Sequence, residues 1–473
     1  MDGSKAWTSD LAALGILLLG LSSRLLAADA RGSLPFDSSS GEVADLVTIF
    51  NTGFESGDSS DWSDTTPNGC PAPTGGPTLH ANAVAPNEIW TAEASPHILT
   101  NNVTVPPGVT LTLSPCAEVR IRPNFQLYVQ GTLSARGTPL RRITIHRDNP
   151  ALPFANVWVV HPGFADIAFV DLDGGGSLDG ALVVQAVSPP LVRPVTVDHL
   201  KVSGSAGYGV QLFANAGFTA ASRDLVVSGS GATQPASPFP VRLGLTAVGT
   251  LPVGSYAGNA NDLVQVIISA NLPTDLTFHD RGVPYQLGGG GNAAVLNVIG
   301  SPSLATLTIE AGVELQFYSL GSSFGGLFLG TNSRLVAVGT TAAPILFTGL
   351  GVAPPAGSWE GITFDTAVDP GTVLDRVRID AAGAHSGSQG YGCPPAADGN
   401  QTDGALKIFV QPASEFLHNS TISNSISHGV FRAWTGGLVD FLPTNTFDNV
   451  AFCRQVLPHP PPPASCPVNP DCP

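Results

Sequence analysis

The sequence predicts an all-β fold: a right-handed parallel β-helix solenoid with two long internal copies and short capping segments at both ends. The main support is an internal repeat. Residues 111–121 (LTLSPCAEVRI) return as residues 307–317 (LTIEAGVELQF), and residues 133–138 (LSARGT) return as residues 335–340 (LVAVGT). Collinear self-similarity of this length is typical of repeat architectures, in which each coil stacks only on its neighbours. Composition agrees, because Gly (54) and Pro (41) favour turns and Lys occurs at only three positions.

Short runs of alternating apolar and polar residues predict the strands. From about residue 88 these runs are separated by Pro or Gly: 103–105 (VTV), 109–113 (VTLTL), 119–121 (VRI), 127–129 (LYV) and 143–145 (ITI). Such alternation is expected when one strand face is buried and the other is solvated. Short strands without intervening helices fit a β-sandwich or a parallel β-helix, and the long internal copy favours the β-helix. The crossover rule for parallel strands makes its coils right-handed.

The ends of this pattern predict the domain organisation. Residues 1–30 have the features of a signal peptide, with Lys5, an apolar run over 11–21 and an Ala-x-Ala cleavage site at 28–30. An uncleaved membrane anchor is the alternative, although the run is shorter than a membrane span. The remaining chain is expected to comprise a flexible N-terminal segment and cap over 31–88, the β-helix over 89–455 with copies at about 89–263 and 264–455, and a Pro/Cys-rich tail over 456–473.

Six cysteines in an exported chain predict disulfides, and with them a secreted or cell-surface protein that has no transmembrane span after signal cleavage. Fifteen complete pairings are possible, and the sequence leaves them open. The six are Cys70, Cys116, Cys393, Cys453, Cys466 and Cys472. Four of them lie outside the repeat core or in its insertions, near the ends where a solenoid must close its edge strands.

Several phrases carry a family resemblance: residues 107–115 (PGVTLTLSP), 307–313 (LTIEAGV), 339–348 (GTTAAPILFT), 357–364 (GSWEGITF) and 418–425 (HNSTISNS). They resemble exported bacterial proteins with right-handed parallel β-helix repeats, over roughly residues 88–455. The resemblance implies the fold and export. It implies no activity, because these phrases are strand and turn elements shared by members without an assigned reaction.

A cluster of carboxylates makes residues 171–180 (DLDGGGSLDG) a candidate calcium loop. Asp171, Asp173 and Asp179 could present oxygen ligands around a glycine turn. The segment departs from the EF-hand pattern, and the second copy has VRIDAAG in the same place. The alternative interpretation is therefore a strand end followed by a turn, and calcium is the one cofactor that the sequence brings into consideration.

Carboxylates of the second copy are candidates for catalysis, because polysaccharide lyases and hydrolases also use the parallel β-helix. The candidates are Asp365, Asp369, Asp375 and Asp380, which lie on successive elements beside Arg376 and Arg378, and Asp375 and Asp380 are the weak alternatives for a catalytic role. None of the phrases shown by those enzymes is present, so a solvated acidic rim is the expected interpretation.

Several aromatic and histidine side chains are candidates for ligand binding or for packing. Trp90, Trp158, Trp359 and Tyr285 could stack on sugar rings, but Trp158 and Trp359 align in the two copies, which favours a packing role. His199 and His418 lie one position apart in the repeat alignment, before matching strands. They are therefore expected to be turn or stacking residues.

The sequence therefore predicts a non-enzymatic exported or cell-surface protein, acting as a monomer, that binds polysaccharide or a protein partner along the solenoid flank. The alternative is a polysaccharide lyase or glycoside hydrolase on the same scaffold. A net charge of −16 makes nucleic acid an unsuitable partner.

Overall fold

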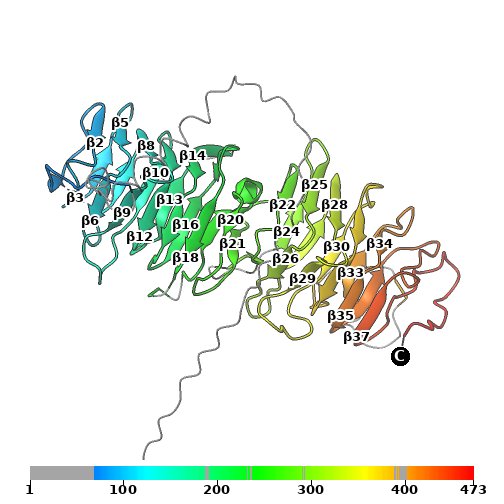
Figure 1. Cartoon of the computed structure of the whole chain (residues 1–473). Helices are drawn as coiled ribbons and strands as arrows, with labels where there is room; N and C mark the ends of the chain where they lie inside the picture. The colour runs from blue at the N-terminus through cyan, green and yellow to red at the C-terminus, as the bar shows by residue number, and fades with distance from the viewer. Residues whose placement is uncertain are drawn as a thin grey trace, which may run out of the picture. The chain divides into compact units, whose positions relative to one another are not determined.

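The computed structural model describes residues 69–186, 191–231, 233–234, 237–289, 291, 293, 295–387, 390, 392–393 and 402–472. They belong to one compact unit and form parallel strands arranged in long sheets (Figure 1). Every pairing between the strands is parallel, and successive strands along the chain enter different sheets. The predicted parallel β-helix is thus confirmed, and its handedness stays a prediction from the crossover rule. The predicted signal peptide lies outside the described residues.

Two sheets are confined to the first part of the chain. Sheet 1 has eight strands: β1 (Thr78–His80), β3 (His97–Leu99), β6 (Glu118–Ile121), β9 (Ile143–Arg147), β12 (Val170–Asp173), β15 (Lys201–Ser203), β18 (Leu225–Ser228) and β20 (Gly254–Ser255). Sheet 2 has six strands: β2 (Glu88–Trp90), β5 (Thr110–Leu113), β8 (Thr132–Arg136), β11 (Phe164–Ala168), β14 (Val192–Asp198) and β17 (Ala216–Phe218).

Sheet 3 has thirteen strands and runs through both copies. It contains β4 (Val103–Val105), β7 (Leu127–Val129), β10 (Val157–Val160), β13 (Gly180–Gln185), β16 (Tyr208–Phe213), β19 (Val241–Gly244), β21 (Val264–Ile267), β23 (Tyr285–Leu287), β26 (Glu314–Phe317), β29 (Ile345–Gly349), β32 (Val377–Asp380), β35 (Thr421–Ser425) and β37 (Thr446–Val450).

Two five-stranded sheets are confined to the second copy. Sheet 4 contains β22 (Leu276–Phe278), β25 (Ala305–Ile309), β28 (Ser333–Val338), β31 (Val373–Asp375) and β34 (Leu417–His418). Sheet 5 contains β24 (Val295–Val298), β27 (Gly326–Leu329), β30 (Ile362–Phe364), β33 (Gly404–Ile408) and β36 (His428–Arg432).

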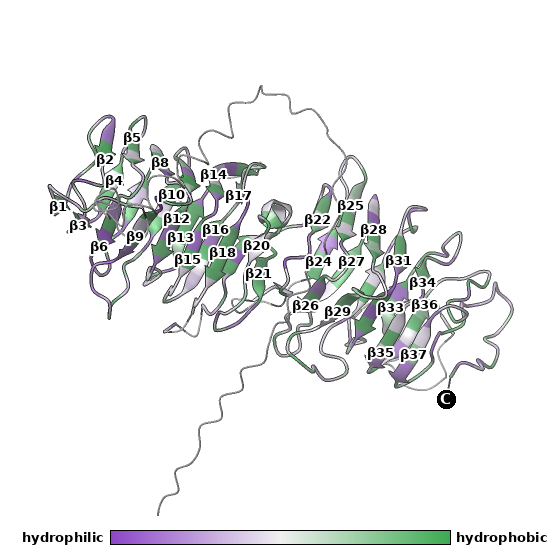
Figure 2. Cartoon of the chain, in the orientation of Figure 1, coloured by the Kyte–Doolittle hydropathy of each residue, from purple (hydrophilic) through white to green (hydrophobic). Residues whose placement is uncertain are grey.

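The core is built from stacks of like side chains inside the coils. In β5, Leu111 and Leu113 are at most 1% exposed while the intervening Thr112 lies on the outer face. The in-register pairing of β5 with β8 places Leu111 on Leu133 of the next coil. Figure 2 shows this mixture of hydrophobic and hydrophilic residues along individual strands. Each coil therefore buries its apolar face against the coils above and below it.

The second copy repeats the strand order of the first, but each strand lies in a different sheet. The counterparts of strands in sheets 1, 2 and 3 lie in sheets 3, 4 and 5, respectively. Residues 111–121 span β5 and β6, in sheets 2 and 1, whereas the matching residues 307–317 span β25 and β26, in sheets 4 and 3. The same rule relates β1–β16 to β21–β36. Strands of sheet 3 in the second copy are thus the counterparts of sheet 1, and the sequence did not predict this change of face.

The junction between the copies is made by β19 and β21. They pair from Val241 with Val264 to Gly244 with Ile267, so sheet 3 continues without a break. Sheet 2 ends at β17, and the 3-10 helix η2 (Leu245–Thr250) lies between β17 and β22 with its apolar side chains buried. Sheet 1 ends at the two-residue strand β20. Only one sheet therefore passes from copy to copy through direct pairing.

The β-helix begins earlier than residue 89. Strand β1 pairs with β3 and lies inside the segment predicted to be flexible or loosely capping. Near this end the buried Trp90 stacks on two imidazoles that also contact each other, with ring centroids 4.1 Å from His80 and 5.2 Å from His97. This stack orders the first coils, which explains why a segment poor in repeat signal still forms strands.

Three disulfides tie the capping segments to the β-helix: Cys70–Cys116, Cys393–Cys466 and Cys453–Cys472. The first is near the N-terminal end, and the other two hold the C-terminal tail. Such bonds form in an oxidising compartment. No helix within the described residues is long and apolar enough to span a bilayer.

The disulfides predict that protein taken from its native compartment contains no free thiol. Alkylation of the denatured, unreduced protein followed by mass spectrometry should detect no modified cysteine, and six after reduction. Reduction should also promote end-to-end association before the central coils melt, because the caps protect unpaired strand edges. Six alkylated cysteines before reduction would contradict both the disulfides and the oxidising compartment.

The histidine stack predicts that the N-terminal coils lose stability in acid. His97 Nε2 donates to the Thr91 carbonyl (2.9 Å), so in the neutral pair His97 Nδ1 accepts from His80 Nε2 (3.1 Å). Burial lowers the pKa of both imidazoles. The unfolded chain then binds more protons, so the stabilisation is complete above pH ~6.5 and is lost as pH falls through the folded-state values.

Hydrogen exchange of residues near β1–β3 at pH 5 and pH 7.5 would measure this effect. We expect protection factors, which correct for the intrinsic pH dependence of exchange, to be lower at pH 5 than at pH 7.5 in these strands alone. A His97→Gln variant, which keeps a donor to Thr91 and cannot be protonated, should reduce the difference between the two pH values. Equal protection at both pH values in the native protein would contradict the role assigned to the stack.

Candidate functional site

A hollow of about 560 Å³ lies on the outer face of sheet 1 beside the copy junction. Its floor is one in-register row on four successive coils, from Asp171 to Lys201, Val226 and Ser255. Space is left at one end because β20 consists of only glycine and serine. The full lining is Arg142, Asp171, His199, Leu200, Lys201, Asp224, Val226, Gly254 and Ser255.

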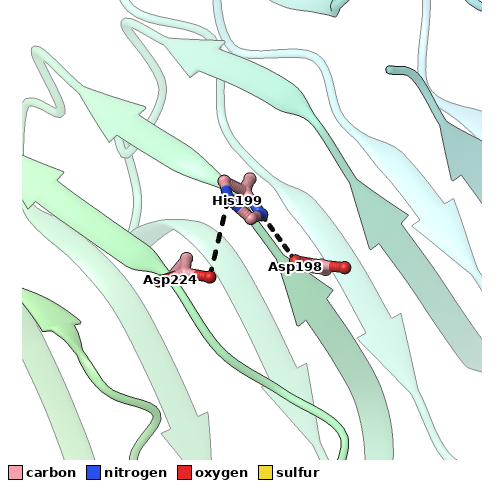
Figure 3. Close-up of side chains that lie close together, drawn as sticks. All are labelled: Asp198, His199 and Asp224. Atoms are coloured by element: carbon pink, nitrogen blue, oxygen red, sulfur yellow. Dashed lines mark hydrogen bonds and ion pairs between the residues drawn. The ribbon is translucent and has the colours of Figure 1, made fainter. Parts of the chain in front are cut away.

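His199 projects from a turn at the edge of this hollow, between two carboxylates (Figure 3). Its Nδ1 donates to Asp198 Oδ1 at 2.6 Å, and its Nε2 lies 3.6 Å from Asp224 Oδ2. His199 and Asp224 both have left-handed backbone conformations, with φ of 54° and 52°. Phe169 takes the same conformation one coil earlier and stacks on His199 with centroids 4.5 Å apart. His199 is therefore a stacked turn residue, in agreement with the prediction.

Hydrogen bonds keep Asp198 ionised. Burial would raise the pKa of this carboxyl, but hydrogen bonds from His199 and Arg223 outweigh it and hold the pKa below its usual value. Arg223 contacts both Asp198 oxygens, at 3.0 and 2.7 Å. Asp198, His199 and Asp224 form the one group in the described part of the chain whose three possible ligand atoms lie within 4.8 Å of one another. Because the Arg223 guanidinium already donates to both carboxylate oxygens of Asp198, this group is a hydrogen-bonded network rather than an open metal site.

Arg142 fixes the opposite wall of the hollow. Its guanidinium makes a two-pronged contact with Asp171 (2.9 and 2.8 Å) and also donates to the His199 carbonyl at 2.9 Å. Lys201 is exposed and, among the described residues, forms no ion pair. The hollow thus has rigid acceptors and donors around one uncommitted ammonium group.

The structure does not bring the three carboxylates of the candidate calcium loop together. Asp171 is paired with Arg142, and Asp173 with Arg147 and Ser203, while Asp179 is not grouped with either. Two of the three carboxylates therefore already have cationic partners, and their oxygens do not converge on one point. The alternative interpretation, a strand end followed by a glycine turn, describes this segment.

The two copies share one carboxylate–serine contact. Ser203 donates to Asp173 at 2.8 Å, and Ser423 donates to Asp380 in the equivalent coil of the second copy. An arginine also contacts each carboxylate, Arg147 in the first copy at 3.2 Å and Arg378 in the second at 3.0 Å. Because the same contact serves both copies, its role is to join neighbouring coils.

Asp375 and Asp380 do not form a catalytic pair. Asp375 ends β31 in sheet 4 and is bound by Arg376 and Asn419, whereas Asp380 ends β32 in sheet 3. Side chains on different faces of the β-helix cannot flank one glycosidic bond. Each carboxylate instead belongs to its own surface ion-pair network.

Three of the four aromatic candidates are unavailable to a ligand. Trp90, Trp359 and Tyr285 are at most 1% exposed. Trp359 stacks on Phe317 with centroids 4.3 Å apart, which confirms its packing role. Trp158 is half-buried on the outer face of sheet 3, whereas Trp359 precedes β30. The two tryptophans therefore do not occupy equivalent positions in the structure, and the prediction that they align in the two copies is wrong.

Sequence reasoning missed Arg142, Lys201, Asp198 and Asp224 as neighbours of His199. A signal was present in the spacing, because residues 142, 171 and 201 recur at intervals close to one coil length. This spacing identifies neighbours only when the boundaries of each coil are known, because a register shift of one residue moves a side chain to the other face of its strand.

Comparison with known proteins gives no further assignment: no family model, no curated protein and no solved structure matches this chain.

The shared carboxylate–serine contact predicts a structural effect of its removal. Asp380→Asn should lower the free energy of unfolding by about 1–2 kcal/mol, because a largely buried carboxylate loses charge-assisted hydrogen bonds. Asp173→Asn should cost less, about 0.5–1 kcal/mol, since its side chain is 44% exposed. Urea unfolding of both variants would test this. An Asp380→Asn variant as stable as the native protein would contradict the assignment.

Proposed function

We propose that the protein is exported and that it binds an acidic polysaccharide in the hollow on sheet 1. The observation that carries the proposal is the uncommitted Lys201 on the floor of a rigid hollow of about 560 Å³. This volume suits a few sugar units, since ligand sites usually measure about 300–1,000 Å³. A sugar carboxylate or sulfate would give the ammonium group the partner that it lacks.

The other lining groups support a sugar rather than an apolar ligand. Arg142 and Ser255 offer donors, while Asp171 and Asp224 offer acceptors. Sugar hydroxyls act as both donors and acceptors and can use this mixture. Because Arg142, Asp171 and His199 are already held by ion pairs and hydrogen bonds, Lys201 is the lining side chain that loses most conformational entropy on binding.

Export is supported by the disulfides and by the predicted signal peptide. The phrases of the sequence support membership of the exported bacterial β-helix proteins, and a monomer anchored at or released from the cell surface is the form that we propose. A protein partner on the same flank is the competing ligand class. It would be detected as binding that does not depend on Lys201.

Lys201→Ala is predicted to weaken the binding of polygalacturonate or alginate about tenfold, with a smaller salt dependence, because one ion pair is lost. Isothermal titration at low and moderate salt measures both quantities. Arg136→Ala is the matched control, since Arg136 is an exposed cation on sheet 2, paired with Asp166. Unchanged affinity of the Lys201 variant, or an equal loss in the control, would exclude this site.

A further inference from the structure

A second cluster of ionisable groups lies on the outer face of sheet 5. Lys407 of β33 is fully buried, between Thr363 on one neighbouring strand and Phe431 on the other. Its Nζ lies 3.5 Å from Asp403, whose side chain is 2% exposed. The buried ammonium thus has a buried counter-ion, an arrangement that is costly to assemble.

Asp403 also orients a histidine that reaches solvent. His385 Nδ1 donates to Asp403 Oδ2 at 2.8 Å, and the Ser386 amide donates to the other oxygen at 3.1 Å. The His385 side chain is 61% exposed, and no interaction of its Nε2 occurs among the described residues. A carboxylate on Nδ1 fixes the tautomer in which Nε2 carries a lone pair. His385 therefore presents a proton acceptor at the surface.

Glu360 supplies the complementary group. Its carboxyl has no hydrogen-bond partner in the described part of the chain. Glu360 and Asp403 precede the paired strands β30 and β33, and the adjacent Gly361 lies against the Gly404 and Ala405 carbonyls, next to Asp403 in the chain. Burial raises its pKa to about 7, with a further increase from Asp403 and an opposing effect of Lys407 and His385. A large share of this carboxyl is therefore protonated at neutral pH and can donate a proton.

The first copy shows that the β-helix does not need this cluster. The counterparts of Glu360 and Lys407, by strand pairing, are Ala155 and Val183, which are at most 1% exposed. Only Asp403 has an acidic counterpart, Asp179. A buried ion pair is no more stabilising than well-packed apolar side chains, so the charges of the second copy point to chemistry.

We propose that Glu360 and His385 form an acid–base site that hydrolyses a glycosidic bond of the polysaccharide bound by this protein. His385 Nε2 takes a proton from water as the water oxygen bonds to the anomeric carbon. The bond from that carbon to the leaving oxygen breaks, and Glu360 gives its proton to that oxygen. One water is consumed and two hydroxyl-ended sugars result, with no other reactant. Asp403 is a positioning residue for His385.

Glycosidic cleavage fits these groups better than elimination. A sugar alkoxide leaves poorly unless it is protonated, which is the task of an acid that retains its proton near neutral pH. Elimination from a uronate also needs a cation on the sugar carboxylate, and Lys407 is too buried to touch one. The proposal rests on the proposed polysaccharide binding and adds an activity to it.

The test uses the full chain with polygalacturonate, alginate and a neutral β-glucan, and measures released reducing ends and unsaturated products. Glu360→Gln, which imitates the protonated carboxyl, and His385→Gln should each lower the rate at least about 100-fold. Asp179→Asn is the matched control from the first copy and should keep the native rate. The native rate should fall as pH rises above about 7, where Glu360 loses its proton. Circular dichroism and melting temperature verify folding.

The outcomes separate the two proposals. Binding that depends on Lys201 without release of reducing ends overturns the acid–base site and leaves the binding function intact. Release of reducing ends that depends on Glu360, with affinity independent of Lys201, supports the acid–base site and overturns the binding hollow. A native rate in the Glu360→Gln variant overturns the mechanism. So does an unsaturated product for each reducing end released, because elimination forms both and hydrolysis forms only the reducing end. Absence of both binding and turnover overturns both.

Discussion

The pairing of β19 with β21 is the contact on which the rest of the structure depends. A strand edge left without a partner exposes a row of backbone amides and carbonyls, so the second copy must continue a sheet of the first. It does so with the counterpart of sheet 1 placed on sheet 3. Because the second-copy counterparts of sheets 1 and 2 lie in sheets 3 and 4, sheets 1 and 2 both end at the junction. The short β20 at the end of sheet 1 then leaves room for the hollow.

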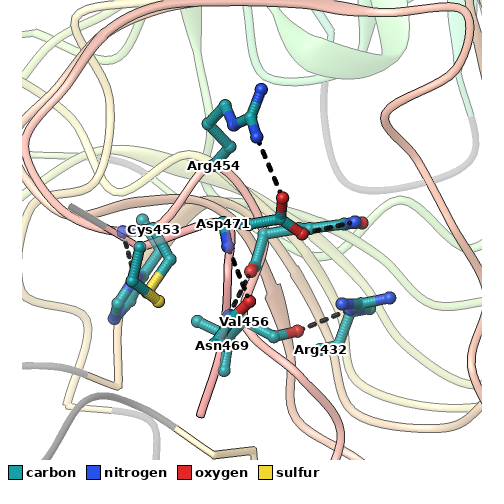
Figure 4. Close-up of a disulfide and its surroundings, with 9 residues drawn as sticks. Arg432, Cys453, Arg454, Val456, Asn469 and Asp471 are labelled. Carbon is teal, nitrogen blue, oxygen red and sulfur yellow. Dashed lines mark hydrogen bonds and ion pairs between the residues drawn. A yellow bond between two sulfur atoms is a disulfide. The ribbon is translucent and has the colours of Figure 1, made fainter.

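The two outer ends of the β-helix need a different solution. At the C-terminal end the tail is held by the Cys453–Cys472 disulfide and by an ion pair of 2.9 Å between Arg454 and Asp471 (Figure 4). The buried Arg432 donates to the Val456 carbonyl, and burial lowers its pKa to about 10. It thus stays charged at neutral pH and ties the tail to the last coil. Covalent and charge-assisted contacts replace the strand that would otherwise continue the sheet.

The internal copy serves as a comparison within one molecule. Contacts present in both halves, such as Ser203 with Asp173 and Ser423 with Asp380, meet needs of the coil itself. Groups present in one half alone, such as Lys407 where the other half has Val183, are not required by the fold. By this criterion Asp173 and Asp380, which the sequence offered as weak calcium and catalytic candidates, are structural. The side chains that carry the proposed chemistry lie in or beside the insertion near residue 385.

The sequence by itself determined the fold class, the presence of two copies and the turn role of His199, because alternation along a strand and recurrence along a chain are local properties. The tertiary structure decided the sheet on which each strand of the second copy lies, the disulfide partners, and the separation of Trp158 from Trp359. It also decided which charges meet, since Asp171, Lys201 and Asp224 come together only through the length of each coil. Coil length and register are set by the packing of turns against their neighbours, which no short stretch of sequence contains.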